Sequence, residues 1–313
     1  MIESDVVTSD AGLDAQGPHF ARAAAFGRRD GFYRDAEHAS VLFCARGPKL
    51  LVSFCNLASF ERKADERLPW LSAIAAEEGW SHLGVMAHRK DWYRNPGTPE
   101  LLRDLANDGF FRRFDPVVFT GTSMGAFAAL VYAALVPGSD VLAFSPQSTL
   151  NTQIAPFETR YPWPRRKFDW SAPDWLDAAD YVGASRRVIV PYDPLVAEDK
   201  AHVTRLRGGA VEPLACRFMG HQMPNALKRA GVLRPLLHMA MGEGLDRLAF
   251  YRAFRTGRRS MAEWRKAMVR HAEAQGQVRR MRLICQVTQS DLPGPWFRKT
   301  LERLDEAGMD ASR

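Results

Sequence analysis

The 313-residue sequence predicts an α/β fold, in which helices cover both faces of a mostly parallel sheet. Two observations lead to this prediction. Apolar runs of strand length alternate with helix-length segments between about residues 40 and 235, which is typical of a parallel sheet with crossover helices. One of these runs, Val117–Phe119, is apolar without alternation, as expected for a parallel strand buried on both faces.

The predicted elements follow one another in a regular order. Residues 1–36 are assigned to an N-terminal extension that is polar and alanine-rich over its first 30 residues. The expected strands are short apolar runs at 40–44, 49–54, 82–87, 117–119, 140–145, 186–193 and 214–221. The first two are expected to pair as a hairpin around Arg46-Gly47-Pro48. Helices are expected at 69–78, from Thr98-Pro99-Glu100 to about 113, and directly after Ser123.

The expected core, residues 37–240, contains an unusual insertion at 147–180. Aromatic and basic residues crowd it: Phe157, Arg160, Tyr161, Trp163, Arg165, Arg166, Lys167, Phe168 and Trp170. Loops of this length are usually functional or disordered, and the aromatic content argues against disorder. We expect a lid whose basic residues suit an anionic group on the substrate, such as that of an acyl carrier. The alternative is a surface loop that its aromatics anchor.

Residues 241–313 are expected to form a basic helical C-terminal extension. Amphipathic helices at 244–256, 260–275 and 295–307 accompany the apolar segment 281–287. This region has 15 Lys and Arg against 9 Asp and Glu, and so holds +6 of the net charge of +7. Such a tail can contact nucleic acid, an anionic membrane or an acidic partner. It has neither aromatic-basic interleaving nor a helix-turn-helix pattern, so a solvated face is favoured over nucleic-acid binding.

The composition, 46% hydrophobic and 25% charged, is that of an ordinary globular protein. No apolar run reaches 18 residues, so no transmembrane segment is expected, and the acidic first residues do not resemble a secretory signal. The cysteines lack C-x-x-C spacing, which favours buried free thiols and a cytoplasmic location; they are Cys44, Cys55, Cys216 and Cys285. Neither a metal nor a cofactor is expected, because no His/Cys cluster has metal-ligand spacing.

Residues 121–125 read Gly-Thr-Ser-Met-Gly, a G-x-S-x-G motif between an apolar strand and an alanine-rich helix. In this context Ser123 is expected at a sharp strand-to-helix turn, with Gly121 and Gly125 leaving room for the two elements to approach. The alternative is a glycine-rich turn with a capping serine. The strand before the motif and the helix after it favour a nucleophile.

A serine nucleophile needs a base and an acid that orients it, in the order Ser, Asp, His on this fold. Asp193 falls just past one predicted strand, and Gly220-His221 closes another. With its G-x-S-x-G motif, Asp193-Pro-Leu-Val196 and Gly220-His221, the chain resembles the α/β-hydrolase superfamily over roughly residues 40–235. The resemblance implies that Ser123 is the nucleophile, His221 the general base and Asp193 the orienting acid.

Other residues compete for these roles. Asp199 and His202 are three positions apart and could form a local pair, for which a solvated contact on a helix is the favoured interpretation. His88 ends the strand at 82–87 and could line the pocket without taking part in the chemistry.

The oxyanion hole is expected to use the Met124 amide and a donor from the loop after strand 49–54. Asn56 and Leu57 are the candidates there, since the His-Gly-Gly-Gly run of many lipases is absent. Asn56 could also act through its side-chain amide. The candidate substrate-binding residues are Trp92, Tyr93, Arg165 and Arg166.

The function expected from this resemblance is cleavage of a small-molecule ester or thioester through an acyl-enzyme. An acyltransferase would use the same residues with an alcohol or amine in place of water. A catalytically silent binding or scaffold protein is the third possibility, and the presence of all three residue types argues against it. The sequence makes no prediction of oligomeric state.

Overall fold

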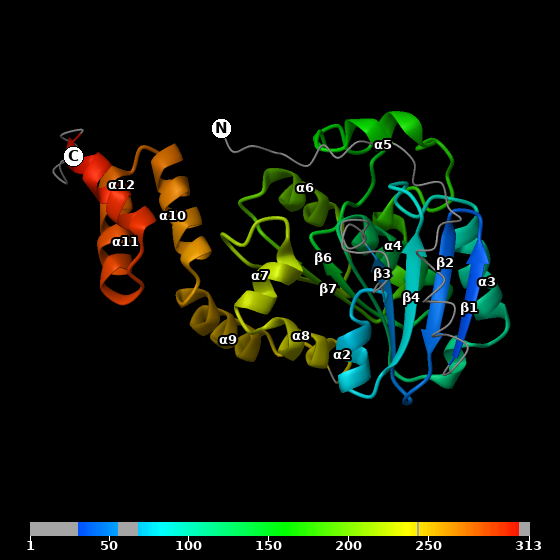
Figure 1. Cartoon of the computed structure of the whole chain (residues 1–313). Coiled ribbons are helices and arrows are strands. Elements are labelled where there is room, and N and C mark those ends of the chain that lie inside the picture. Colours follow the sequence, from blue (N-terminus) through cyan, green and yellow to red (C-terminus); the bar gives the residue numbers. More distant parts are fainter. Residues whose placement is uncertain (1–30, 56–67, 243, 307–313) are drawn as a thin grey trace. The chain divides into compact units, whose positions relative to one another are not determined.

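The fold was examined in a computed structural model of the whole chain (Figure 1). The structure describes residues 31–55, 68–242 and 244–306. The chain divides into two compact units. The first consists of Met1–Val190 with Ala201–Glu212, and the second of Pro191–Lys200 with Pro213–Arg313.

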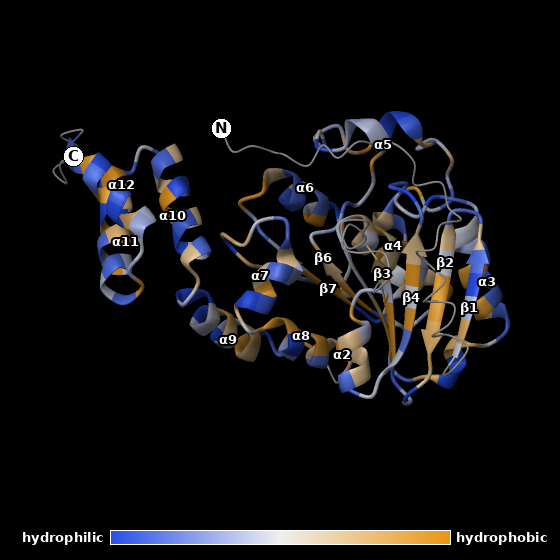
Figure 2. Cartoon of the chain, viewed as in Figure 1, coloured by the Kyte–Doolittle hydropathy of each residue, from blue (hydrophilic) through white to orange (hydrophobic). Residues whose placement is uncertain are grey.

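Within the described residues, an eight-stranded sheet has the order β1-β2-β4-β3-β5-β6-β7-β8. The strands are β1 (Gly31–Ala36), β2 (Ala39–Cys44), β3 (Leu50–Cys55), β4 (Ser81–Ala87), β5 (Val117–Thr122), β6 (Asp140–Phe144), β7 (Arg187–Tyr192) and β8 (Val211–Ala215). From β4 through β3, β5 and β6 to β7 neighbouring strands pair parallel, while β2 pairs antiparallel with β1 and β4. The predicted mostly parallel sheet is therefore confirmed. Strands β2 to β6 are buried along their length, which explains why most of their residues are apolar (Figure 2).

Three details of the predicted strands are wrong. The expected hairpin of 40–44 with 49–54 does not form, because β4 lies between β2 and β3. A short connection allows two strands to pair but does not require it. Instead β1, in the segment assigned to the extension, pairs with β2 through a tight turn at His38, whose φ is 64°. The last strand, β8, lies earlier than the expected 214–221.

Helices cover both faces of the sheet in the first unit. On β3, Ser53 bonds the ring of His82, and His82 in turn bonds Ser72 at the start of α2 (Ser72–Glu77). Phe54 is the next residue and so points to the opposite face, where its ring stacks on Tyr132 of α4 (Met124–Tyr132). The other helices that carry residues of this unit are α3 (Gly97–Asn107), α5 (Pro162–Lys167) and part of α6 (Ala197–Arg205).

The second unit is mainly helical. Its helices are α7 (Met223–Arg229), α8 (Leu233–Ala240), α9 (Arg247–Arg259), α10 (Ala262–Ala274), α11 (Val278–Asp291) and α12 (Pro295–Glu306). The last three share a small core made of Val269, Ala272, Met281, Cys285, Phe297 and Leu304. The apolar segment 281–287 therefore belongs to α11, because Met281 and Cys285 are one helical turn apart on its buried side.

The four cysteines are free thiols and are buried, as the sequence predicted. Burial raises the pKa of Cys55 to about 12, so this thiol stays protonated at neutral pH. None of the helices in the described ranges is long and apolar enough to cross a membrane.

Candidate active site

Ser123 lies at the junction of β5 and α4 in a backbone conformation that residues with a side chain rarely adopt. Its φ is 53° and its ψ is −115°. The amide of Ser123 donates to the Phe144 carbonyl at 2.9 Å, and the Ser123 carbonyl accepts from the Phe127 amide at 3.0 Å. Strand β6 and helix α4 therefore hold the turn from both sides.

Gly121 and Gly125 are required by close packing at this turn. A Cβ atom at position 121 would lie 2.2 Å from the carbonyl group of Gly125. A Cβ atom at position 125 would lie 2.5 Å from the carbonyl oxygen of Phe54 on β3. Backbone atoms cannot move aside as a flexible side chain can, so a larger residue at either position would displace the elements that fix Ser123.

The side chains of Gln147 and Tyr161 contact the Ser123 hydroxyl. Ser123 Oγ donates to Gln147 Oε1 at 3.0 Å and lies 3.3 Å from the Tyr161 hydroxyl. Gln147 follows β6, as Ser123 follows β5. Because β5 and β6 are parallel, both residues lie at the carboxyl ends of their strands, on the same side of the sheet. The sequence analysis missed Gln147 because glutamine belongs to no catalytic motif. Its place just past the strand beside the elbow strand is the signal that could have found it.

Trp92 joins this group of polar side chains. Its indole N–H donates to the same Gln147 Oε1 at 3.1 Å, and its ring meets that of Tyr161 edge-on at 4.9 Å. The prediction that Trp92 binds substrate is not tested by these contacts, but they place it beside residues that touch Ser123.

A buried histidine ties the insertion at 147–180 to α6. The Nδ1 atom of His202 accepts from the Ser148 amide at 3.0 Å, which leaves the ring proton on Nε2. That nitrogen lies 3.1 Å from Glu158 Oε2, and both side chains are fully buried. Burial by itself raises the pKa of Glu158, but hydrogen bonds from His202 and Arg160 outweigh it and lower the pKa to about 2. Glu158 is therefore a carboxylate.

In the second unit, His221 pairs with Asp199. His221 Nδ1 lies 2.9 Å from each carboxylate oxygen of Asp199. The Asp199 side chain is fully buried, whereas that of His221 keeps 23% of its surface exposed. A carboxylate at Nδ1 fixes the ring proton on that nitrogen, which makes Nε2 the basic one.

The carboxylate at His221 is thus that of Asp199, and not that of Asp193 as the sequence analysis expected. Asp193 Oδ2 accepts from the Gly220 amide at 2.8 Å, and its Oδ1 accepts from the Leu195 amide at 3.0 Å. Asp193 therefore fixes the backbone directly before His221. Position after β7 favoured Asp193 in the sequence, but Asp199 in the first turn of α6 presents a carboxylate as well.

The local pair of Asp199 with His202, kept open as an alternative, stays untested. Asp199 bonds His221, and His202 bonds Ser148 and Glu158. Ser123 and His221 belong to different units, so their joint action stays a prediction.

Met124 is the first residue of α4, and the first amides of a helix have no partner within it. The Met124 amide is therefore suited to the expected role of oxyanion donor. The candidates for a second donor, Asn56 and Leu57, lie outside the described residues.

The surroundings of Tyr93 argue against the predicted role in substrate binding. Its side chain is fully buried, and its hydroxyl donates to the carbonyls of Cys55 and Val85 in the core of the sheet. His88 is also buried and bonds Ser40 Oγ on β2 at 3.1 Å.

The two predicted substrate-binding arginines differ in their surroundings. Arg165 donates to the Leu150 and Ala155 carbonyls, both at 3.1 Å, and so fastens the insertion to itself. Arg166 is exposed on the same helix, α5. Of these two arginines, Arg166 is therefore the more exposed one and the better candidate for meeting an anionic group.

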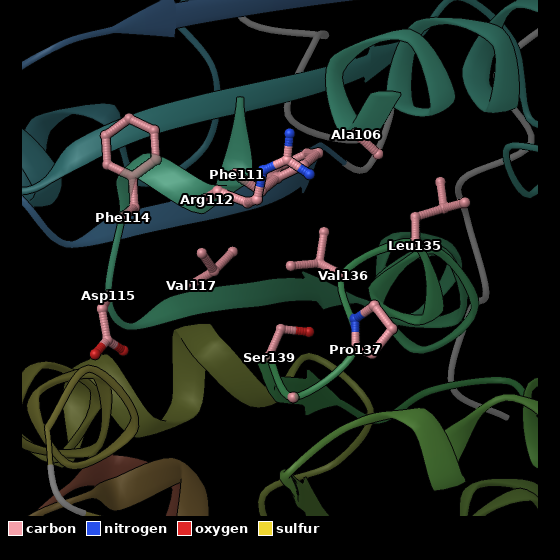
Figure 3. A pocket seen from close by; sticks show the side chains of 11 residues that line it. Ala106, Phe111, Arg112, Phe114, Asp115, Val117, Leu135, Val136, Pro137 and Ser139 are labelled. Carbon is pink, nitrogen blue, oxygen red and sulfur yellow. The ribbon is translucent and has the colours of Figure 1, made fainter. Parts of the chain in front are cut away.

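A pocket of about 400 Å³ lies at the amino ends of β5 and β6, whereas Ser123 lies at the carboxyl end of β5 (Figure 3). It is lined by Val117, the first residue of β5, and by Ser139, which directly precedes β6. Ligand sites of parallel sheets lie at the carboxyl ends of the strands, where Ser123 is. The pocket is therefore separate from the candidate active site. The described ranges contain no group of His, Cys, Asp and Glu side chains suited to a metal ion.

No protein-family model and no curated protein sequence matches the chain. Three solved structures illustrate what it is similar to. The capsule O-acetyltransferase of Neisseria meningitidis serogroup A has 10% identity and a TM-score of 0.45, over 67% of this chain and 93% of that one. Est1E from Butyrivibrio proteoclasticus has 12% identity and a TM-score of 0.44, over 67% and 98%. A hyperthermophilic esterase from the archaeon Pyrobaculum calidifontis has 15% identity and a TM-score of 0.42, over 71% and 88%. Similarity at this level does not assign an activity.

Proposed function

We propose that this protein is a serine hydrolase of the α/β-hydrolase type, which cleaves a carboxylic ester or thioester through an acyl-enzyme. The observation that carries the proposal is the strained backbone of Ser123, at a turn whose packing excludes a Cβ atom at both flanking glycines. Backbone strain that the surrounding structure maintains is characteristic of functional sites. The bonded pair of His221 and Asp199 supports it, because an activated serine needs such a base and acid.

In the proposed first step, Ser123 Oγ attacks the carbonyl carbon while His221 Nε2 takes the hydroxyl proton. Asp199 holds Nδ1–H and stabilises the imidazolium that forms. The Met124 amide donates to the oxygen that becomes negative. His221 then gives its proton to the departing alkoxide or thiolate, and the acyl group stays on Ser123.

In the proposed second step, water attacks the acyl carbon as His221 removes its proton, and His221 then returns this proton to Ser123 Oγ as the carboxylic acid leaves. If an alcohol or amine takes the place of water, the same residues perform acyl transfer. The acceptor is decided by product analysis. Release of free acid in the presence of added alcohol supports hydrolysis, and formation of a new ester identifies a transferase.

The insertion at 147–180 is proposed to form the rim of the substrate site. Its support is that Gln147 and Tyr161 contact Ser123 while Glu158 and His202 hold the insertion in place. A cytoplasmic location is proposed on the four buried free thiols, which suit a reducing compartment.

The test compares the full-length protein with Ser123→Ala, using hydrolysis of 4-nitrophenyl butyrate and labelling by a fluorophosphonate probe. We expect turnover and labelling in the wild type and neither in Ser123→Ala, with little change in melting temperature. Ser290→Ala, at an exposed position of α11, is the matched control and should behave as the wild type. Undiminished turnover in Ser123→Ala, or a wild type that neither turns over nor labels, would contradict the proposal.

A further inference from the structure

The carboxamide of Gln147 has a fixed orientation. An indole N–H can only donate, so the Gln147 atom that faces Trp92 Nε1 must be the oxygen. The Ser123 hydroxyl donates to that same oxygen at 3.0 Å. Both donors therefore bind Oε1, so the other polar atom of the carboxamide is the Nε2 amino group.

Among the described residues, this amino group is a buried donor without a hydrogen-bond partner. The Gln147 side chain is fully buried, and Nε2 has no hydrogen-bond partner in the part of the chain that the structure describes. Buried polar groups are almost always paired, since an unmade bond forfeits the hydration that the group had in the unfolded chain. Exceptions therefore call for an explanation, and binding of a ligand is one.

The backbone beside Gln147 is held on several sides. The Ser148 amide donates to His202, the Ser148 carbonyl accepts from the Ala178 amide at 2.7 Å, and Ser148 Oγ accepts from Arg205 at 2.9 Å. These bonds fix the backbone that carries Gln147, and turning its carboxamide to a partner elsewhere would break its own bonds to Trp92 and Ser123. The donor is therefore held close to the nucleophile.

We propose that Gln147 Nε2–H binds an oxygen atom of the substrate close to the ester bond that Ser123 attacks. The inference rests on the proposed function and adds a substrate class to it. The preferred ester carries an ether, hydroxyl or carbonyl oxygen within a few bonds of the scissile carbonyl, in its acyl or its alcohol half. A purely aliphatic ester leaves the donor unpaired, and sites built to bond an oxygen discriminate strongly against analogues that lack it.

Two pairs of esters of equal size test this inference, one for each half of the substrate. The acyl pair is 4-nitrophenyl methoxyacetate against 4-nitrophenyl butyrate, and the alcohol pair is 2-methoxyethyl acetate against butyl acetate. The measured quantity is the ratio of kcat/KM within each pair, divided by the same ratio for hydroxide, because an ether oxygen also activates the carbonyl. We expect this corrected ratio to favour the oxygen-bearing ester by about tenfold or more in at least one pair.

Gln147→Met should bring that ratio close to one while it keeps the size of the side chain. Gln153→Met, at an exposed glutamine of the same insertion, should keep the wild-type ratio. The inference is overturned if the wild type shows no corrected preference in either pair, a result that needs no variant. It is also overturned if Gln147→Met keeps the preference. If the wild type hydrolyses none of the four esters and Ser123 is not labelled, the proposed function itself fails.

Discussion

His202 and His221 each bond a fully buried carboxylate, but they differ in what surrounds the imidazole. His202 is itself fully buried, with Ser148 on one ring nitrogen and Glu158 on the other. His221 is held by Asp199 at Nδ1 and keeps 23% of its side-chain surface exposed. A fully buried imidazole links the segments of the chain that it bonds, whereas a partly exposed imidazole is accessible to a substrate. The two histidines differ in exposure, and we propose that this difference separates a structural role for His202 from a catalytic role for His221.

The buried pair also has a definite place in the account of the site. His202 binds the amide of Ser148, which follows Gln147, and it binds Glu158, which lies three residues before Tyr161. The side chains of Gln147 and Tyr161 contact Ser123 Oγ. The buried histidine is therefore linked to the candidate nucleophile through the insertion, while His221 is proposed to act on the nucleophile by proton transfer.

Replacing each histidine is the sharpest way to break this comparison. His221→Ala should lower kcat by about 10⁴-fold or more, because it removes the proposed base. His202→Ala should lower the melting temperature, because it leaves the Glu158 charge buried without one of its partners. Ester hydrolysis and thermal unfolding are measured on both. Two variants with the same loss of activity and of stability would show that the pairs do not differ in role.

Replacing the two aspartates tests which carboxylate orients His221. Asp199→Asn should lower kcat by about 10³- to 10⁴-fold, because an amide at Nδ1 favours the wrong tautomer of the ring. Asp193→Asn should cost far less activity, since its carboxylate bonds the Gly220 and Leu195 amides and the asparagine keeps one acceptor. Steady-state measurement of kcat for both variants distinguishes the two assignments. A larger loss in Asp193→Asn would restore the assignment made from the sequence.

The Glu158 carboxylate gives the buried pair a pH dependence of known sign. Its pKa falls from the usual 4.5 to about 2, so its contribution to stability is complete above pH 4.5 and disappears as the pH falls toward 2. Glu158→Gln should therefore lower the free energy of unfolding by ~3 kcal/mol at neutral pH. The difference between wild type and variant should shrink as the pH is lowered through this range. Denaturant unfolding at several pH values measures it, and a difference independent of pH would contradict the assignment.

The smallest effect is expected at the arginines of the insertion. Arg166→Ala should lower kcat/KM a few-fold on an anionic acyl thioester, more so at low salt, and leave a neutral ester unchanged. Arg165→Ala should instead destabilise the protein by ~1 kcal/mol, because it removes two bonds to backbone carbonyls. Equal losses on both substrates in Arg166→Ala would show that this arginine supports the fold.

The sequence was informative where one local segment determines the structure. The strand before Ser123, the glycines around it and the helix after it lie within about fifteen residues, and each leaves a mark in the pattern of apolar and small residues. The alternation of strands and helices could be predicted from the sequence for the same reason. The order of the strands was less so, because the insertion of β4 between β2 and β3 depends on pairing between distant segments.

The candidate site was only partly predictable because its contacts join loops that are far apart in sequence. Gln147 is 24 residues from Ser123, and Asp199 is 22 residues from His221. Position after a strand pointed to Asp193, while the actual partner comes from the first turn of the next helix. Tyr93 and Arg165 were chosen by residue type. Residue type does not reveal that their polar groups donate hydrogen bonds to backbone carbonyls.

The most direct test of the central claim is to map the site of covalent modification. The full-length protein is treated with a fluorophosphonate, and its adduct is located by mass spectrometry of the digested protein, beside His221→Ala and Asp199→Asn. We predict a single adduct on Ser123 in the wild type, formed far more slowly when either partner is replaced. An adduct on a different residue, or modification of Ser123 at an unchanged rate in both variants, would contradict a nucleophile activated by His221 and Asp199.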